Sequence, residues 1–254
     1  MEEIETVILA GGFGMRFGEK TKKVPKPMIK LGREPILIHI IKKYINSKCF
    51  SFIIATGYKY NVINKYFSSR SLKIEKIGLH SYAYTLKINN IKVYIKTIYT
   101  GLNTLTGTRI LKLDKYIQSS RFYLTYGDGL SDVNLRKLFK FHLKSKCLGT
   151  VTSVRPPARF GELIIKNNLV QSFKEKPQLK DGWINGGFFI FEKKFIKLID
   201  KKRNVMLEKQ PLETLTKKKK FSAFYHNGFW QCMDTFRDYN LLKKMNTIHA
   251  PWKK

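Results

Sequence analysis

Short apolar runs that end at glycine recur along the first half of the chain, and segments with helical spacing lie between them. The first run, residues 6–10, reads TVILA and is followed directly by Gly11 and Gly12. An apolar run of this length, bounded by glycine, is typical of a buried parallel strand. Comparable runs lie at 50–55, 122–126 and 150–154. Apolar residues at helical spacing occupy 35–45, 58–67, 109–117 and 133–143.

Strands that alternate with helices predict βαβ units and therefore an α/β fold with a parallel sheet. Right-handed crossovers place the loops after these strands along one edge of the sheet, where ligands bind. Residues 72–100 are rich in Ile, Tyr and Thr and predict irregular strands. The second half is mixed: we expect strands at 163–165, 170–173 and 184–191, and helices near 193–199, 207–217 and 235–245.

The composition is that of a folded protein without membrane spans. The chain has 254 residues, of which 43% are hydrophobic, and this is enough apolar surface for a sizeable core. No apolar run reaches the about 18 residues that a membrane span needs, and the acidic start does not resemble a secretion signal. Three cysteines far apart in the sequence argue against a disulfide framework or a CxxC metal site. We therefore expect a cytoplasmic, reduced protein.

The net charge of +31 has two interpretations. One is a polyanionic partner, either a nucleic acid or an anionic membrane. The other is a general lysine bias spread over solvated surfaces. The lysines are scattered through almost every segment, and the only tight run is at 217–220. Because no basic stripe with interleaved aromatic residues is present, we favour the second interpretation and expect no specific nucleic acid and no membrane as a partner.

The loop after the first expected strand contains candidate phosphate ligands. Residues 9–16 read LAGGFGMR, and 25–28 read PKPM. Glycines after a strand allow the backbone N–H groups to approach a phosphate, although the spacing is neither that of a dinucleotide fingerprint nor that of a Walker loop. Arg16 can grip phosphate oxygens, and Lys26, held between two prolines, can supply a point charge. Either cation alone would be read as an ordinary surface residue.

Two carboxylates and one helix start lie at later loops. Asp128 follows an expected buried strand within TYGDG, and Asp234 lies in FWQCMDT just before an expected helix. Carboxylate and phosphate oxygens are the ligands that Mg²⁺ prefers. The structural alternatives are an Asp–Gly turn for Asp128 and a helix N-cap for Asp234. The segment LTGTR, 105–109, opens a helix whose free N–H groups could meet a nucleotide, or whose start Thr106 or Thr108 could cap.

The sequence GGFGMR…PKPM is similar to the signature of the sugar-phosphate nucleotidyltransferases, GGxGTRL…PKPM, with Met15 and Phe17 as departures. Five segments follow the family's order between residues 7 and 238. The resemblance implies a Rossmann-like mixed, mainly parallel sheet flanked by helices, Mg²⁺ as cofactor and a homo-oligomer. We expect one domain over 1–254, with a nucleotide-binding half at about 1–155 and a sugar-phosphate-binding half at about 156–254.

The resemblance also implies roles for individual residues. The expected catalytic residues are Lys26 and Arg16, and the expected metal ligands are Asp128 and Asp234. The expected nucleotide-binding residues are Leu9, Ala10, Gly11, Gly12, Gly14, Met15, Arg16, Lys26, Thr106, Gly107, Arg109 and Asp128. The expected sugar-phosphate-binding residues are Tyr126, Gly161, Glu175, Lys176, Asn185, Gly186 and Trp230, with Glu175 and Asn185 on sugar hydroxyls and Lys176 on the phosphate.

Within the family, the segments RFG, SFKEKP, INGGFF, GFWQxMDT and APWK together resemble the glucose-1-phosphate cytidylyltransferases. This implies CTP and glucose 1-phosphate as substrates and CDP-glucose as a product for bacterial surface polysaccharide, such as the lipopolysaccharide O-antigen. The alternatives are a uridylyl- or thymidylyltransferase with the same loop, and a non-catalytic regulatory protein of the same fold. Loss of Lys26, Asp128 or Asp234 would favour the non-catalytic protein, and all three are present.

Overall fold

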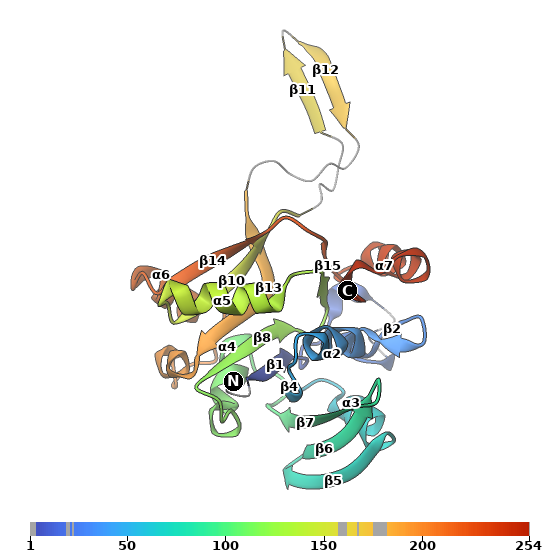
Figure 1. Ribbon diagram of the computed structural model, residues 1–254, viewed down its shortest axis with the longest axis vertical. Coiled ribbons are helices and arrows are strands. Elements are labelled where there is room, and N and C mark those ends of the chain that lie inside the picture. Colours follow the sequence, from blue (N-terminus) through green and yellow to red (C-terminus); the bar gives the residue numbers. More distant parts are fainter. Residues whose placement is uncertain are drawn as a thin grey trace.

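The computed structural model describes residues 4–18, 21, 23–156, 162–166, 168–174 and 182–253. One nine-stranded sheet crosses the body of the molecule (Figure 1). Its strands lie in the order β14 (Phe221–His226), β10 (Gly149–Val154), β13 (Ile184–Glu192), β8 (Arg121–Tyr126), β1 (Glu5–Leu9), β4 (Ser51–Thr56), β7 (Ile91–Tyr99), β6 (Ser81–Ile88) and β5 (Ser71–Gly78).

The centre of the sheet is parallel and its flanks are partly antiparallel. Strand β1 runs parallel to both β4 and β8, and β4 runs parallel to β7. Strand β13 is antiparallel to its neighbours β8 and β10, whereas β5, β6 and β7 form an antiparallel meander. The mixed α/β fold is therefore confirmed, and the carboxyl ends of β8, β1, β4 and β7 share one edge of the sheet.

Helices cover both faces of the sheet, as the alternation of side chains along β1 shows. Ile8 packs into a core with α2 (Ile36–Asn46), α3 (Tyr60–Ser68), α5 (Leu135–Ser145) and α7 (Phe236–Ile248). Val7 and Leu9 point to the opposite face and pack with α4 (Thr106–Lys112), α6 (Gln210–Lys217) and the 3₁₀ helix η4 (Lys193–Leu198). Since every residue of β1 is buried, the short apolar run near the N-terminus forms the middle of the protein.

Several elements differ from the expected ones. The helix expected at 109–117 begins earlier, at Thr106, and ends at Lys112, before a short 3₁₀ turn, η3 (Asp114–Tyr116). The segment near 193–199 is a 3₁₀ helix rather than an α-helix. The sequence patterns did not predict β14, nor the short antiparallel pair of β9 (Gly129–Ser131) and β15 (Trp230–Cys232). These strands are short or half-exposed, so they carry little apolar periodicity.

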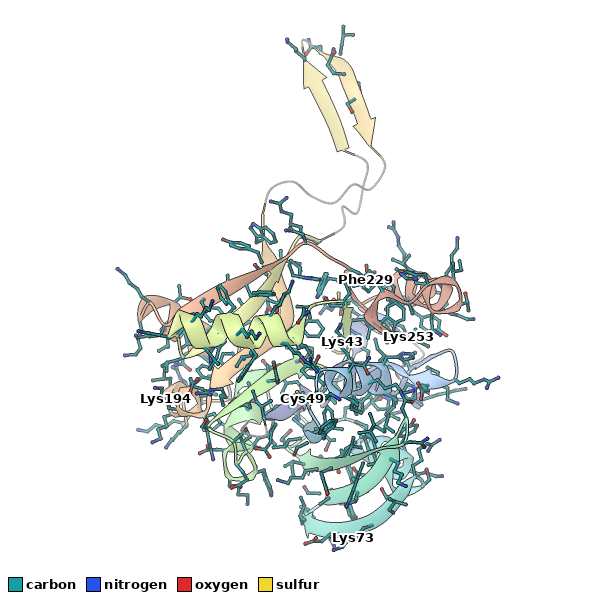
Figure 2. The ribbon with its side chains drawn as sticks, viewed as in Figure 1. Lys43, Cys49, Lys73, Lys194, Phe229 and Lys253 are labelled. Carbon is teal, nitrogen blue, oxygen red and sulfur yellow. The ribbon has the colours of Figure 1, made fainter. Side chains whose placement is uncertain are left out.

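A hairpin of β11 (Glu162–Lys166) and β12 (Leu169–Lys174) stands away from the body of the molecule (Figure 1). The basic side chains, by contrast, are distributed over the whole body. Lys73, Lys194 and Lys253, labelled in Figure 2, lie on widely separated parts of it. Within the described residues, no helix combines the length and the apolar content that crossing a membrane requires. The division of the chain near residue 155 remains a prediction, and the nine-stranded sheet takes strands from both sides of it.

Candidate active site

The glycine-rich loop leaves β1 with its first residues fixed against the end of β4. Ala10 N donates to Ala55 O at 2.9 Å, and Gly11 O accepts from Tyr58 N at 3.1 Å. Gly14 has φ +66°, and a Cβ there would lie 3.2 Å from the Cβ of Lys26. Glycine is required at this position because the backbone is left-handed and the lysine passes close by.

The same loop presents a series of backbone donors without protein acceptors. Among the residues that the structure describes, none accepts a hydrogen bond from the N–H groups of residues 12–16. Gly12, Met15 and Arg16 are exposed residues. Consecutive unpaired N–H groups in a turn form a concavity that binds anions. The loop therefore has the backbone geometry that the predicted contact with a phosphate requires.

Lys26 lies beside this loop between two carboxylates. Its Nζ donates to Asp128 Oδ2 at 2.6 Å and to Asp234 Oδ1 at 2.5 Å, and the residue is only 8% exposed. Arg16, with an exposed side chain, places Nη1 at 3.4 Å from Asp234 Oδ2. Two cations and two anions from distant parts of the chain are thus brought together, as the sequence motifs predicted.

Backbone hydrogen bonds position the two carboxylates. Gly127 N donates to Leu9 O at 3.0 Å, which joins the loop after β8 to the loop after β1. Met233 N donates to Asp128 O at 2.8 Å, which places Asp234 beside Asp128. Thr235, not Asp234, is the N-cap of α7, and Asp238 completes its capping box. Because another residue caps the helix, the carboxylate of Asp234 can face Lys26.

Mutual attraction keeps Lys26 and Asp234 ionised. Burial alone would lower the pKa of Lys26, but the charges and hydrogen bonds of Asp128 and Asp234 outweigh it and raise the pKa above its usual value. Burial would raise the pKa of Asp234, but its bond to Lys26 and the nearby Arg16 hold that pKa below its usual range. Lys26 is therefore cationic and Asp234 anionic at neutral pH.

The two carboxylates suit Mg²⁺. One oxygen of each lies within hydrogen-bond distance of the same nitrogen, so small movements would let both contact one ion. The described residues contain no group of three or more His, Cys, Asp or Glu side chains that could hold a metal. Mg²⁺ retains several waters and takes one or two carboxylates together with substrate phosphates. The donor set thus fits an ion that the substrate helps to hold.

The N–H of Gly107 at the start of α4 already has a protein acceptor, and the expected contacts of Thr106 and Gly107 with the nucleotide remain predictions. Gly107 N donates to Val205 O at 3.0 Å, and the Thr106 hydroxyl bonds Glu208 and Leu207 N, both at 2.8 Å. A Cβ at Gly107 would lie 2.9 Å from Val205 O. The segment around Val205 covers this helix end and accepts hydrogen bonds from the N–H groups of Gly107 and Thr108.

The structure places Arg109 against the glycine-rich loop, and its expected contact with the nucleotide remains a prediction. Its side chain is 3% exposed and lies beneath the glycine-rich loop. Its guanidinium donates to five protein oxygens, which are Gly11 O, Thr56 O, Thr100 Oγ1, Gly101 O and Leu102 O. These hydrogen bonds join the guanidinium to the loops after β1, β4 and β7.

The expected sugar-side residues that the structure describes lie together. Trp230 Nε1 donates to Gly186 O at 2.7 Å, and Asn185 Oδ1 accepts from Gly187 N at 2.8 Å. Asn185 also lies beside the side chain of Tyr126. Gly161, Glu175 and Lys176 lie outside the described residues, so their predicted contacts with the sugar phosphate remain predictions.

Glu208 was not identified from the sequence, yet it joins the two sides of the site. Its carboxylate accepts hydrogen bonds from the hydroxyls of Tyr126 and Thr106. Burial, followed by the charge of Glu208, raises the pKa of Tyr126, so the phenol stays protonated and donates. The sequence signal that could have pointed to Glu208 is the scarcity of acidic residues around it. Glu208 is the only acid between Asp200 and Glu213, in a chain with 18 acids and 49 Lys and Arg residues.

Gly187 shapes the sugar side through its backbone. It has φ +78°, and a Cβ there would lie 2.7 Å from Cδ2 of Tyr126. We expect Gly187→Ala to lower the free energy of unfolding by about 2 kcal/mol, because both the conformation and the contact are strained. In the control, Gly129→Ala, the new Cβ meets nothing within 4 Å. Urea unfolding measures both variants, and equal losses would contradict this assignment.

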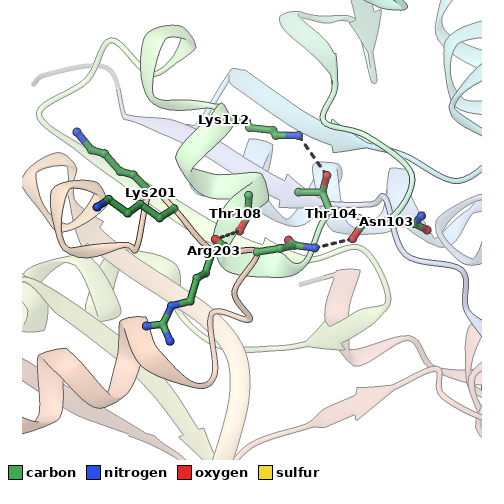
Figure 3. Close-up of a pocket in the computed structure, with 8 residues that line it drawn as sticks. Asn103, Thr104, Thr108, Lys112, Lys201 and Arg203 are labelled. Carbon is green, nitrogen blue, oxygen red and sulfur yellow. Dashed lines mark hydrogen bonds between the residues drawn. The ribbon is translucent and has the colours of Figure 1, made fainter.

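A separate polar cavity of about 360 Å³ lies beside α4 and not at the glycine-rich loop (Figure 3). Its lining residues are Asn103, Thr104, Thr108, Lys112, Lys201, Lys202, Arg203 and Asn204. The cavity includes neither Lys26 nor the two aspartates. We place the candidate active site at the loop because, among the residues that the structure describes, unpaired N–H groups, cations and carboxylates converge there.

Comparisons with known proteins agree with this geometry. The family described as nucleotidyl transferase matches residues 5–246. The chain is 38% identical over 255 residues to the glucose-1-phosphate cytidylyltransferase of Salmonella typhimurium, covering 98% of this chain and 99% of that protein. The Salmonella typhi protein of the same name also shows 38% identity with the same coverage.

A solved structure supports the fold. UDP-glucose pyrophosphorylase complexed with UDP-glucose superposes with a TM-score of 0.69 at 16% identity, covering 96% of this chain and 98% of that chain. Identity this low bears on the fold alone. The family match and the two full-length relatives, taken together with the residues gathered around Lys26, establish that the chain belongs to the nucleotidyl transferase family of enzymes.

Proposed function

We propose that the protein transfers the cytidylyl group of CTP to glucose 1-phosphate, giving CDP-glucose and pyrophosphate. The observation that carries this proposal is Lys26, which lies between Asp128 and Asp234 beside a loop of unpaired N–H groups. The choice of CTP and glucose 1-phosphate rests on the two Salmonella relatives, which are named for that reaction and match the chain over its length.

The reaction requires positioning and charge more than covalent chemistry from the protein. A phosphate oxygen of glucose 1-phosphate attacks the α-phosphorus of CTP in line, and the bond from that phosphorus to the bridging oxygen of pyrophosphate breaks. Lys26 would stabilise the charge that develops on the α-phosphoryl group. Arg16 and the N–H groups of residues 12–16 would hold the leaving pyrophosphate.

Without substrate, the charge of Lys26 is balanced by two aspartates. A triphosphate brought against the loop would attract the ammonium of Lys26 and release carboxylate oxygens of Asp128 and Asp234 for a metal ion. Mg²⁺ bound there would neutralise charge on the phosphate oxygens. Tyr126, Asn185 and Trp230 lie together on the other side, where they would border the sugar phosphate.

Pyrophosphate release from each nucleoside triphosphate tests both the activity and the base preference. With glucose 1-phosphate and Mg²⁺, we expect kcat/KM for CTP to exceed that for UTP, TTP and GTP by about 100-fold, because hydrogen bonds at a pocket edge can supply discrimination of this size. Faster turnover of UTP or TTP would favour the uridylyl- or thymidylyltransferase alternative. No turnover with any triphosphate would favour the non-catalytic alternative.

The homo-oligomeric state and the cytoplasmic location remain proposals. Light scattering on the purified protein measures the first. Because the lysines are scattered, we expect no specific polyanionic partner. The affinity for DNA should therefore be low and should fall steeply as the salt concentration is raised. Tighter binding to DNA than to CTP would contradict the proposal that this site serves a free nucleotide.

A further inference from the structure

Among the described residues, Trp252 is the largest side chain that is fully buried, with 1% of its surface exposed. It lies in the 3₁₀ turn η5 (Pro251–Lys253) and belongs to the core that also contains Ile8 of the central strand β1. The turn contacts both α2 and the short strand β9 (Figure 1). Trp252 therefore joins a helix of the body to a strand that begins beside the candidate active site.

A hydrogen bond holds the indole of Trp252 to α2. Trp252 Nε1 donates to His39 Nδ1 at 3.3 Å, and the two rings meet edge to face with their centroids 6.1 Å apart. An indole N–H can only donate, so the proton of His39 is on Nε2, which donates to Leu31 O at 3.0 Å. Because His39 uses both ring nitrogens, it fixes the orientation of the indole relative to α2.

Trp252 also packs against Phe229, the residue directly before β15, with ring centroids 5.6 Å apart. Phe229 O accepts hydrogen bonds from Asp132 N at 3.1 Å and from Ser131 Oγ at 2.8 Å. Ser131 is the last residue of β9 and pairs with Trp230 of β15. Phe229 thus lies at one end of the β9–β15 pair and links it to the indole.

The β9–β15 pair carries both aspartates of the candidate active site. Asp128 directly precedes β9, and Asp234 lies two residues after the end of β15. Each strand has three residues, and an isolated two-stranded ribbon is at best marginally stable in water. Packing against neighbouring elements must therefore hold the pair, and Leu130 and Met233 are buried in the same core as Trp252.

We infer that Trp252 is a positioning residue that holds Asp128 and Asp234 close enough to share a metal ion. The indole, fixed to α2 by His39, supports Phe229, and Phe229 closes the strand pair from which both carboxylates extend. This inference rests on the proposed function and extends it to a residue of the core. Loss of the ring would let β15 move relative to β9 and would separate the two carboxylates.

The test compares Trp252→Leu with Phe67→Leu, a control in the same core. Phe67 is also fully buried, but it lies on α3 and its ring packs against Tyr66 and Tyr84, away from the strand pair. Residues that orient metal ligands contribute about 10- to 100-fold to metal affinity or activity. In Trp252→Leu we therefore expect the Mg²⁺ concentration for half-maximal pyrophosphate release to rise about tenfold and kcat to fall about tenfold.

Phe67→Leu should keep both values within about twofold, because distant sites without shared partners act independently. Thermal unfolding is recorded for each variant, and the assays are run below both transitions, so that a general loss of stability does not enter the comparison. Wild-type values in Trp252→Leu would overturn the inference. An equal rise in the Mg²⁺ requirement of Phe67→Leu would overturn it as well.

Chemical rescue tests the contribution of the ring itself. Trp252→Gly removes the indole from the core, and small aromatic molecules bind apolar cavities of this kind. We expect indole at millimolar concentration to raise turnover of this variant about tenfold, and 1-methylindole, which lacks the N–H that His39 accepts, to raise it less. A folded Trp252→Gly protein that indole does not rescue would contradict the inference. If this variant does not fold, Trp252→Leu decides the question.

Amide hydrogen exchange distinguishes failure of this inference from failure of the proposed function, because it requires no turnover. Met233 N donates to Asp128 O across the strand pair, whereas Tyr94 N donates to Phe50 O in the main sheet. In Trp252→Leu we expect the amide of Met233 to exchange about tenfold faster and that of Tyr94 to keep its rate, since local opening differs between regions of a protein. Equal acceleration of both amides would overturn the inference, whatever reaction the enzyme catalyses.

Discussion

Replacing Lys26 with alanine is expected to lower kcat about 1,000-fold while the protein remains folded. The ammonium of Lys26 donates to both aspartates, and its side chain passes Gly14 of the glycine-rich loop. Removing one preorganised donor from a transition state costs about 10² to 10³ in kcat. Here the donor also carries a full charge, so we expect the upper end of that range, measured as pyrophosphate release under saturating substrates.

The fold should survive because Lys26 contributes one ammonium and no large apolar surface. The side chains of both aspartates are 26% exposed, so water can solvate them when the lysine is absent. Lys42→Ala is a matched control. Lys42 lies away from the site and forms a partly exposed ion pair with Glu34, with its Nζ 2.6 Å from Oε2. Thermal unfolding should be similar for both variants. A Lys26→Ala enzyme with near wild-type kcat would remove this residue from the mechanism.

Asp234→Asn is expected to lower kcat about 1,000-fold and to weaken CTP binding less than tenfold. Asparagine keeps the shape but loses the charge that Lys26 and a divalent ion require. The loop N–H groups and Arg16 remain, so the triphosphate should still bind. Steady-state kinetics at several Mg²⁺ concentrations, together with calorimetry of CTP binding, measure the two effects separately.

The control for this variant is Asp200→Asn. Asp200 forms an ion pair with Arg203, and this pair contacts neither Lys26 nor the glycine-rich loop. It should leave kcat and the Mg²⁺ dependence unchanged. If Asp234→Asn shows the same magnesium dependence as the wild type, Asp234 is not a metal ligand. Its hydrogen bond to Lys26 then has a structural role.

The features predictable from sequence are those encoded by a few neighbouring residues. The run at 6–10 with its two glycines predicts a buried strand and a ligand loop, and parallel strands bring Asp128 to the same edge as Lys26. The position of Asp234 depends on the pairing of β15 with β9. Strands of three residues are too short for their sequence to predict such a pairing. Its approach to Lys26 was therefore predicted from family resemblance and not from periodicity.

Long-range contacts decide which donors are free, and a local sequence pattern does not reveal them. The sequence LTGTR predicts a helix start but not that Val205 and Glu208 cover it. Arg109 has the chemistry of a phosphate ligand, and only the packing of Gly11 and Gly57 against its guanidinium shows that it lies beneath the loop. Glu208, too, depends on contacts with residues about 80 to 100 positions earlier in the chain.

We propose that one metal ion is shared by Asp128, Asp234 and the phosphates of a bound nucleotide. Electron–nuclear double resonance tests it most directly, with Mn²⁺ in place of Mg²⁺, CTP as ligand and ¹³C in the aspartate carboxyl groups. We predict that a single Mn²⁺ couples to both ³¹P and ¹³C, and that the ¹³C coupling weakens in Asp128→Asn and in Asp234→Asn. Coupling to ³¹P without any coupling to ¹³C would contradict the claim.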